Sequence, residues 1–107
     1  MDTTKIDMFK KVLEIDPVDP AMHFGLGLEY MTAGMYAEAE PCFRKAIEFK
    51  DDYSAAYREL GKALTALGRD QEAIPVYEKG IPIAENNGDI QTGKEMQVFL
   101  NRITCGE

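Results

Sequence analysis

The sequence predicts an all-α fold in which pairs of antiparallel helices stack into a solenoid. Residues 20–53 align with residues 54–87 without a gap, at an offset of 34 residues. Each of these units contains two stretches with apolar residues at helical spacing, which is the layout of a helix-turn-helix repeat. Nine positions are identical between the units: Ala21/Ala55, Leu26/Leu60, Gly27/Gly61, Gly34/Gly68, Glu38/Glu72, Ala39/Ala73, Pro41/Pro75, Lys45/Lys79 and Ile47/Ile81.

The order of small and aromatic residues that the two units share resembles the tetratricopeptide repeat. The first unit carries Leu26, Gly27, Tyr30, Gly34, Ala39, Phe43 and Ala46, and the second carries Leu60, Gly61, Leu64, Gly68, Ala73, Tyr77 and Gly80. Residues 9–17 are similar to the second half of one more repeat. The resemblance implies a right-handed superhelical stack of about six helices in a single domain, 1–107. Its parts are a half repeat (3–19), two full repeats (20–53 and 54–87) and a capping helix (88–104).

Start and stop signals place the first two helices. We expect the first to begin at Thr4 and to end at the Asp-Pro pair of residues 16–17. The pair at residues 19–20 is an N-cap aspartate followed by a proline at the first helical position, where the missing N–H is no loss. This second helix should extend to Thr32 and stop at Gly34 in a left-handed conformation.

The remaining helices follow the same signals. The third is expected from about 36 to 50 and the fourth from about 54 to 67. Asp70 is expected to cap the fifth helix, which should be kinked by a proline near 80–82. Asp89 should cap a sixth helix that does not follow the repeat register and covers the open end of the stack with a polar face.

Composition limits the partners. The formal net charge is −7 and the isoelectric point is about 4.7, which argues against binding to nucleic acid or to an anionic membrane. No apolar segment is long enough to cross a bilayer, and the opening MDTTKIDMFKK does not predict a signal peptide. Cys42 and Cys105 have no metal-ligand spacing, so we expect two reduced thiols in a cytoplasmic protein.

No motif predicts catalysis, a metal or a cofactor. Residues 88–95 fit the pattern GxxxxGK but end in Glu95, where a phosphate loop needs a serine or threonine to bind magnesium. His23 is the single histidine, and the second unit has Tyr57 at the same place, so we interpret it as a packing residue. An enzyme or nucleotide-dependent switch is therefore disfavoured.

The second helix is apolar on nearly all of its faces. One stripe is expected to pack inside the repeat, while Phe24, Leu28 and Met31 form a second stripe at helical spacing. Either neighbouring helices cover this second stripe or a partner binds it.

The family resemblance implies that the first helix of each pair lines a concave surface that holds a partner peptide or helix. The residues that this mapping assigns to the groove are Phe24, Leu28, Met31, Arg58, Glu59, Lys62 and Thr65. Such a groove would be apolar at one end and charged at the other, and would suit a partner with an apolar anchor followed by acidic residues. Each charged residue could instead be an ordinary solvated side chain. The lysine- and arginine-rich clamp that some members use for chaperone C-termini is not expected, because Phe24 and Leu28 stand at its positions.

These observations predict a non-catalytic protein–protein interaction module whose partner is a protein or peptide. The alternative is self-association into a homodimer. The first helix lacks an antiparallel partner, so Ile6, Phe9 and the second helix could leave an apolar face for another copy to close.

Overall fold

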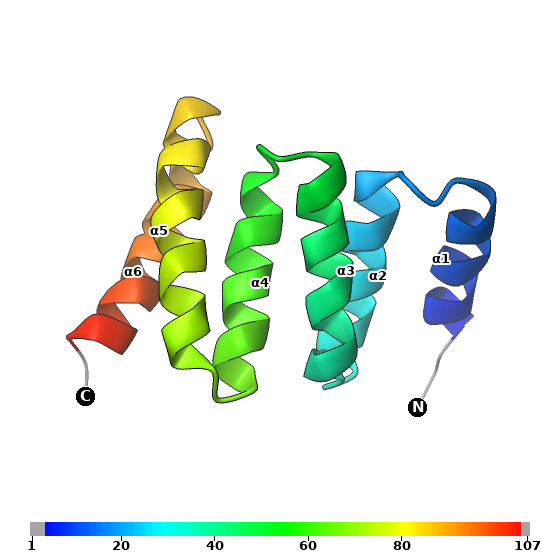
Figure 1. The fold of residues 1–107 in the computed structure, drawn as a ribbon, viewed down its shortest axis with the longest axis horizontal. Helices are drawn as coiled ribbons and strands as arrows, with labels where there is room; N and C mark the ends of the chain where they lie inside the picture. Colours follow the sequence, from blue (N-terminus) through cyan, green and yellow to red (C-terminus); the bar gives the residue numbers. More distant parts are fainter. Residues whose placement is uncertain (1–3, 106–107) are drawn as a thin grey trace.

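The computed structural model describes residues 4–105 and confirms the all-α stack. Six helices follow one another in this part of the chain (Figure 1). Their bounds are α1 (Thr4–Ile15), α2 (Pro20–Thr32), α3 (Tyr36–Phe49), α4 (Ser54–Ala66), α5 (Asp70–Asn86) and α6 (Ile90–Thr104).

Two of the three predicted aspartate caps are confirmed. The Asp19 carboxylate accepts hydrogen bonds from the backbone N–H groups of residues 21 and 22, and Asp89 accepts one from Thr92. The prediction for Asp70 is wrong: Asp70 is the first residue of α5, and the N-cap is Arg69, which makes no side-chain cap bond.

The turn before α5 explains this error. Gly34, Gly68 and Gly88 all have φ near +76° (76°, 77° and 75°), the left-handed region that favours glycine. After each glycine, the next N–H donates a 2.8 Å bond back across the turn, as Arg69 does to the Leu64 carbonyl. This closed turn makes the residue directly after the glycine the N-cap, whatever its side chain. The predicted stop of α2 at Gly34 follows from the same geometry.

The helices form two layers. In Figure 1, α2 lies behind α3 and α6 lies behind α5. The backbones of α2 and α4 approach each other, as do those of α4 and α6, whereas no Cα atom of α3 lies within 8 Å of one in α5. The closely spaced layer of α2, α4 and α6 therefore forms the inner side of the curved stack.

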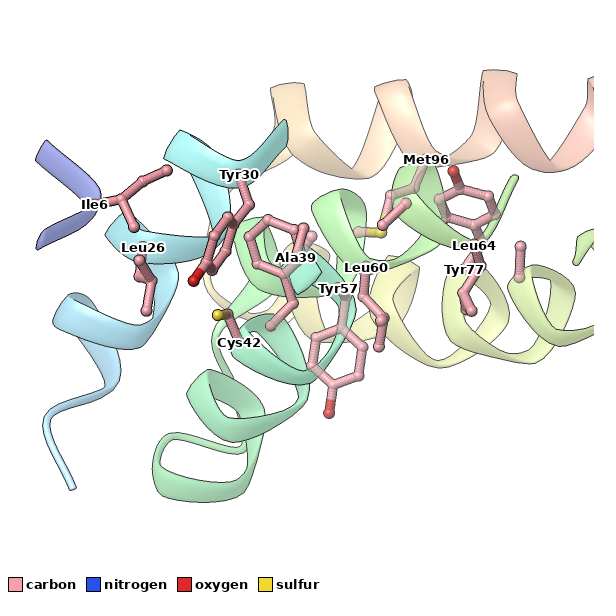
Figure 2. Packing of buried hydrophobic residues seen from close by; sticks show 14 residues of the cluster. Ile6, Leu26, Tyr30, Ala39, Cys42, Tyr57, Leu60, Leu64, Tyr77 and Met96 are labelled. Atoms are coloured by element: carbon pink, nitrogen blue, oxygen red, sulfur yellow. The ribbon is translucent and has the colours of Figure 1, made fainter. Parts of the chain in front are cut away.

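Aromatic rings packed on glycines join the two layers. An added Cβ at Gly27 or Gly61 would lie within 3.0 Å of the ring of Phe43 or Tyr77, so only glycine lets the paired helices approach this closely. The core is one cluster that extends from Ile6 in α1 to Met96 in α6 (Figure 2). Since Ile6 is only 5% exposed, the prediction that it leaves an apolar surface open is wrong.

Candidate functional site

The apolar stripe of α2 is half-buried rather than free. The Phe24 ring lies 4.9 Å from the Tyr53 ring and 5.8 Å from the Phe43 ring, measured between centroids. Leu28 and Met31 are also partly exposed and pack against the core. Each of these side chains thus supports the fold with one side and leaves the other accessible on the inner layer. Neighbouring residues therefore cover the stripe in part, and the binding of a partner to the rest of it stays a prediction.

Arg58 joins α4 to α6. Its guanidinium donates to the Glu59 carboxylate at 2.9 Å, to the Glu95 carboxylate at 2.9 Å and to the Thr92 hydroxyl at 3.3 Å. Burial would lower the Arg58 pKa, but the bonds and the attraction to the two carboxylates outweigh it and raise the pKa. Arg58 is therefore a charged link between helices whose partners are already supplied by the chain.

Glu59 lies beneath the surface rather than on it. The residue is only 5% exposed, and its carboxylate accepts from Arg58 and lies 3.6 Å from the Lys62 ammonium. The expectation that Glu59 faces a partner is therefore wrong. Its buried carboxylate instead interacts with Arg58 and Lys62 and positions their side chains.

A hollow between α4 and α6 adds a wall that the sequence prediction missed. It has a volume of about 320 Å³, and its lining consists of Lys62, Thr65, Ala66, Tyr77, Phe99, Arg102 and Ile103. The Arg102 guanidinium lies over the Phe99 ring, 5.7 Å from its centroid, and the Phe99 ring packs 5.9 Å from the Tyr77 ring. Burial raises the pKa of Tyr77 to about 12, which keeps its phenol neutral.

The two cations available on this face are thus Lys62 and Arg102. The Lys62 side chain is 42% exposed, and Arg102 is also exposed. Arg58 is thus bonded to carboxylates of its own chain, and the expectation that Lys62 faces an anionic group of a partner stays a prediction. The repeat mapping could not identify this wall, because α6 begins at residue 90 rather than at 88, where the 34-residue offset from Ser54 would place it.

The other candidate groups have structural surroundings. A ring nitrogen of His23 lies 2.8 Å from the Pro17 carbonyl, and the His23 ring packs against Phe49. Cys42 is buried, and burial raises its pKa to about 11. Within residues 4–105 no group of three or more metal-binding side chains occurs, and no helix of that segment is long and apolar enough to cross a membrane.

Known proteins resemble this chain in sequence and in fold. A family model described as tetratricopeptide repeat matches residues 24–88. TPR repeat-containing protein PA0015 of Pseudomonas aeruginosa is 35% identical over 98 residues, which cover 92% of this chain and 93% of that protein. The solution structure of protein BPP2914 from Bordetella parapertussis gives a TM-score of 0.80 at 32% identity, covering 96% of this chain and 89% of that one. The crystal structure of a tetratricopeptide repeat domain protein from Salinibacter ruber gives 0.76 at 28% identity, covering 83% and 99%.

Proposed function

Because the chain belongs to the tetratricopeptide repeat family, whose members generally mediate protein–protein interactions, we propose that it binds a short segment of a partner protein on the face formed by α2, α4 and α6. The observation that carries this proposal is the pairing of a half-exposed apolar wall with a hollow that holds two accessible cations. The chain acts by surface complementarity, without catalysis.

The partner segment combines an apolar anchor with nearby acidic residues. The anchor packs on Phe24, Leu28 and Met31, which already have one side fixed against the core and so lose little side-chain freedom on binding. Its carboxylates approach Lys62 and Arg102, which border the hollow between α4 and α6.

The acidic part of the segment must be short. The whole chain carries a net charge of −7, so a long acidic partner would be repelled. Screening at physiological salt limits interactions between exposed charges to roughly 8 Å, so a single carboxylate that contacts Lys62 or Arg102 is little affected by the distant charges of the chain. One or two carboxylates beside an apolar side chain therefore suit this face better than an extended acidic run.

A random peptide library selected on the purified chain tests both features. We expect enrichment of peptides with an aromatic or aliphatic residue close to Asp or Glu. Reversing the charge of both cations, Lys62→Glu with Arg102→Glu, should weaken binding of an enriched peptide at least about tenfold in fluorescence anisotropy. Because Lys62→Glu places a second carboxylate near the buried Glu59, the variant is compared with the unmodified chain in urea unfolding before binding is measured.

The matched control for each single substitution, Lys62→Glu or Arg102→Glu, is Lys94→Glu, which makes the same charge change on an exposed residue of α6 that lies beside α5 and away from the hollow. Its binding should equal that of the unmodified chain. Enrichment of basic peptides, or equal losses in the control and the double variant, would contradict the proposed site.

A further inference from the structure

The outer side of α1 carries the most exposed apolar stripe of the described chain. Met8 is 61% exposed, Val12 is 41% exposed and Ile15 is 87% exposed, and they recur at i, i+4 and i+7 along one face. Val18, 55% exposed, continues the stripe just beyond the helix. Such a run differs from singly scattered apolar residues, and contiguous patches of this kind mark interaction sites.

A groove between α1 and α2 lies beside this stripe. It has a volume of about 460 Å³, and its lining consists of Lys5, Met8, Phe9, Val12, Met22 and Glu29. Phe43 of α3 and Tyr77 of α5 each pack on a glycine of the preceding helix, α2 or α4. Phe9 of α1 packs instead on Gly25 of the following helix, α2. No helix within residues 4–105 covers the other side of α1, which accounts for this exposed apolar face.

We propose that the face formed by α1 is covered by the same face of a second copy, with the two α1 helices antiparallel about a twofold axis. The distribution of charge along the chain favours a second copy as the partner of this face. Residues 4–16 contain three lysines and three carboxylates, a net charge of zero, whereas the chain as a whole carries −7. Two copies therefore repel each other least when they approach through this neutral segment, and a strongly charged partner finds no excess charge there to attract it.

The order of residues along α1 is also self-complementary. In an antiparallel pair centred near residue 10, Met8 lies between Val12 and Ile15 of the partner subunit, which interlocks the two stripes. Lys5, near the start of one helix, then lies opposite Asp16 at the end of the partner subunit's helix. Both side chains are exposed in the single copy and so are available for this contact.

The opposite end of the stack does not offer an equivalent surface. On α6, Ile90 and Val98 are also exposed, but the polar Lys94 and Gln97 lie between them. Packing this mixed face on the stripe of α1 would bury Lys94 against apolar side chains. The end formed by α1 therefore suits its own copy, giving a closed dimer rather than a head-to-tail filament.

The size of the patch predicts a weak dimer. The exposed fractions of Met8, Val12 and Ile15 correspond to on the order of 350 Å² per copy, and flanking side chains bring the total for two copies to about 1,000 Å², the lower limit for a specific interface. We expect a dissociation constant in the micromolar range or weaker, so the dimer is populated at high concentration.

Sedimentation equilibrium from about 1 μM to about 1 mM tests the proposal over this affinity range. The mean mass should rise from the 12.0 kDa of one chain toward twice that value. Ile15→Glu should keep the chain monomeric, while Val98→Glu, the same kind of change on α6, should leave the dimer intact. A chain that stays monomeric at the highest concentration overturns the proposal and assigns the face to a different protein. An association that Val98→Glu removes and Ile15→Glu does not also overturns it.

Charge reversal tests the antiparallel arrangement. Lys5→Glu alone and Asp16→Lys alone should each weaken the dimer about tenfold, because each leaves two like-charged contacts per dimer. Combining the two changes should restore the original affinity. Additive losses in the double variant would exclude this register. The result does not depend on peptide binding at the inner layer, since neither residue lies on that face.

Discussion

Replacing Arg58 by methionine should lower the free energy of unfolding by about 2 kcal/mol. Methionine keeps the apolar stem of the side chain but removes the two 2.9 Å bonds to Glu59 and Glu95. The variant thus separates a structural role for Arg58 from a role in binding a partner.

The magnitude follows from what each carboxylate loses. The Glu59 side chain is 7% exposed, so water cannot replace the guanidinium, and breaking a buried ion pair costs about 3–5 kcal/mol. The Lys62 ammonium, 3.6 Å away, remains as a weaker partner and reduces the loss. The Glu95 side chain is 38% exposed and regains water, so its share is below about 1 kcal/mol.

Urea unfolding followed by circular dichroism measures this loss, with the four chains of a double-mutant cycle: the unmodified chain, Arg58→Met, Glu59→Gln and both changes together. The coupling free energy should be about 1.5 kcal/mol, and the denaturation slope should not change. In the double variant the neutral amide introduced by Glu59→Gln needs no cation, so the double variant should be more stable than the two separate losses together would predict.

Lys62→Met is the matched control, because it removes a cation that is more exposed and more distant from Glu59. It should cost less than about 0.5 kcal/mol. If Arg58→Met were as mild as this control and uncoupled from Glu59→Gln, the structural role of Arg58 would be refuted, and Arg58 would return to the set of partner-binding cations.

Three further predictions concern packing, acid stability and thiol reactivity. Gly61→Ala should destabilise the chain by about 1–2 kcal/mol because its Cβ would overlap the Tyr77 ring, while Gly93→Ala, whose nearest side-chain atom is 3.6 Å away, should stabilise it by about 0.5–1 kcal/mol in thermal melts. The hydroxyl of Ser54 donates a 2.8 Å hydrogen bond to the carboxylate of Asp89, the N-cap of α6, and lowers its pKa. The stability gained from this bond is complete above the ordinary pKa of an aspartate and is lost as the pH falls through the lowered pKa of the folded state. Ser54→Ala should therefore cost about 1 kcal/mol at pH 7 and less near pH 3, as urea unfolding at the two values would show. Burial raises the pKa of Cys42 to about 11, so a thiol reagent at pH 8 should label one cysteine rapidly, the exposed one after α6, and labelling of both at equal rates would contradict the buried position.

Most of the fold could be predicted from the internal repeat, its resemblance to a known repeat family and the turn signals. The 34-residue offset gave the stacking order, and the glycines after α2 and α4 gave the turns, because a left-handed turn residue is a local requirement. The cap of α5 was missed because Asp70 is a favourable cap type, whereas the closed turn had already selected the preceding residue.

The surface could be predicted less well, because exposure depends on contacts between distant parts of the chain. Periodicity in α2 predicted an extra apolar stripe, but Phe24 lies against Tyr53, a residue that precedes the next repeat helix. Glu59 looked like a surface charge because nothing in the local pattern shows that Arg58 reaches across to α6. The exposed stripe of α1 depends on the lack of a neighbouring helix within the described residues, which periodicity does not report.

The packing of α1 also determines where the chain opens first. Among the helices of residues 4–105, the backbone of α1 approaches only that of α2, whereas every interior helix is held from two sides. Free energies of local opening therefore differ along the stack, and amide hydrogens in α1 should exchange with solvent well before those in α4. Any contact that covers the outer side of α1 raises its opening free energy directly, so hydrogen exchange in this one helix reports on occupancy of that face even when the rest of the molecule is unchanged.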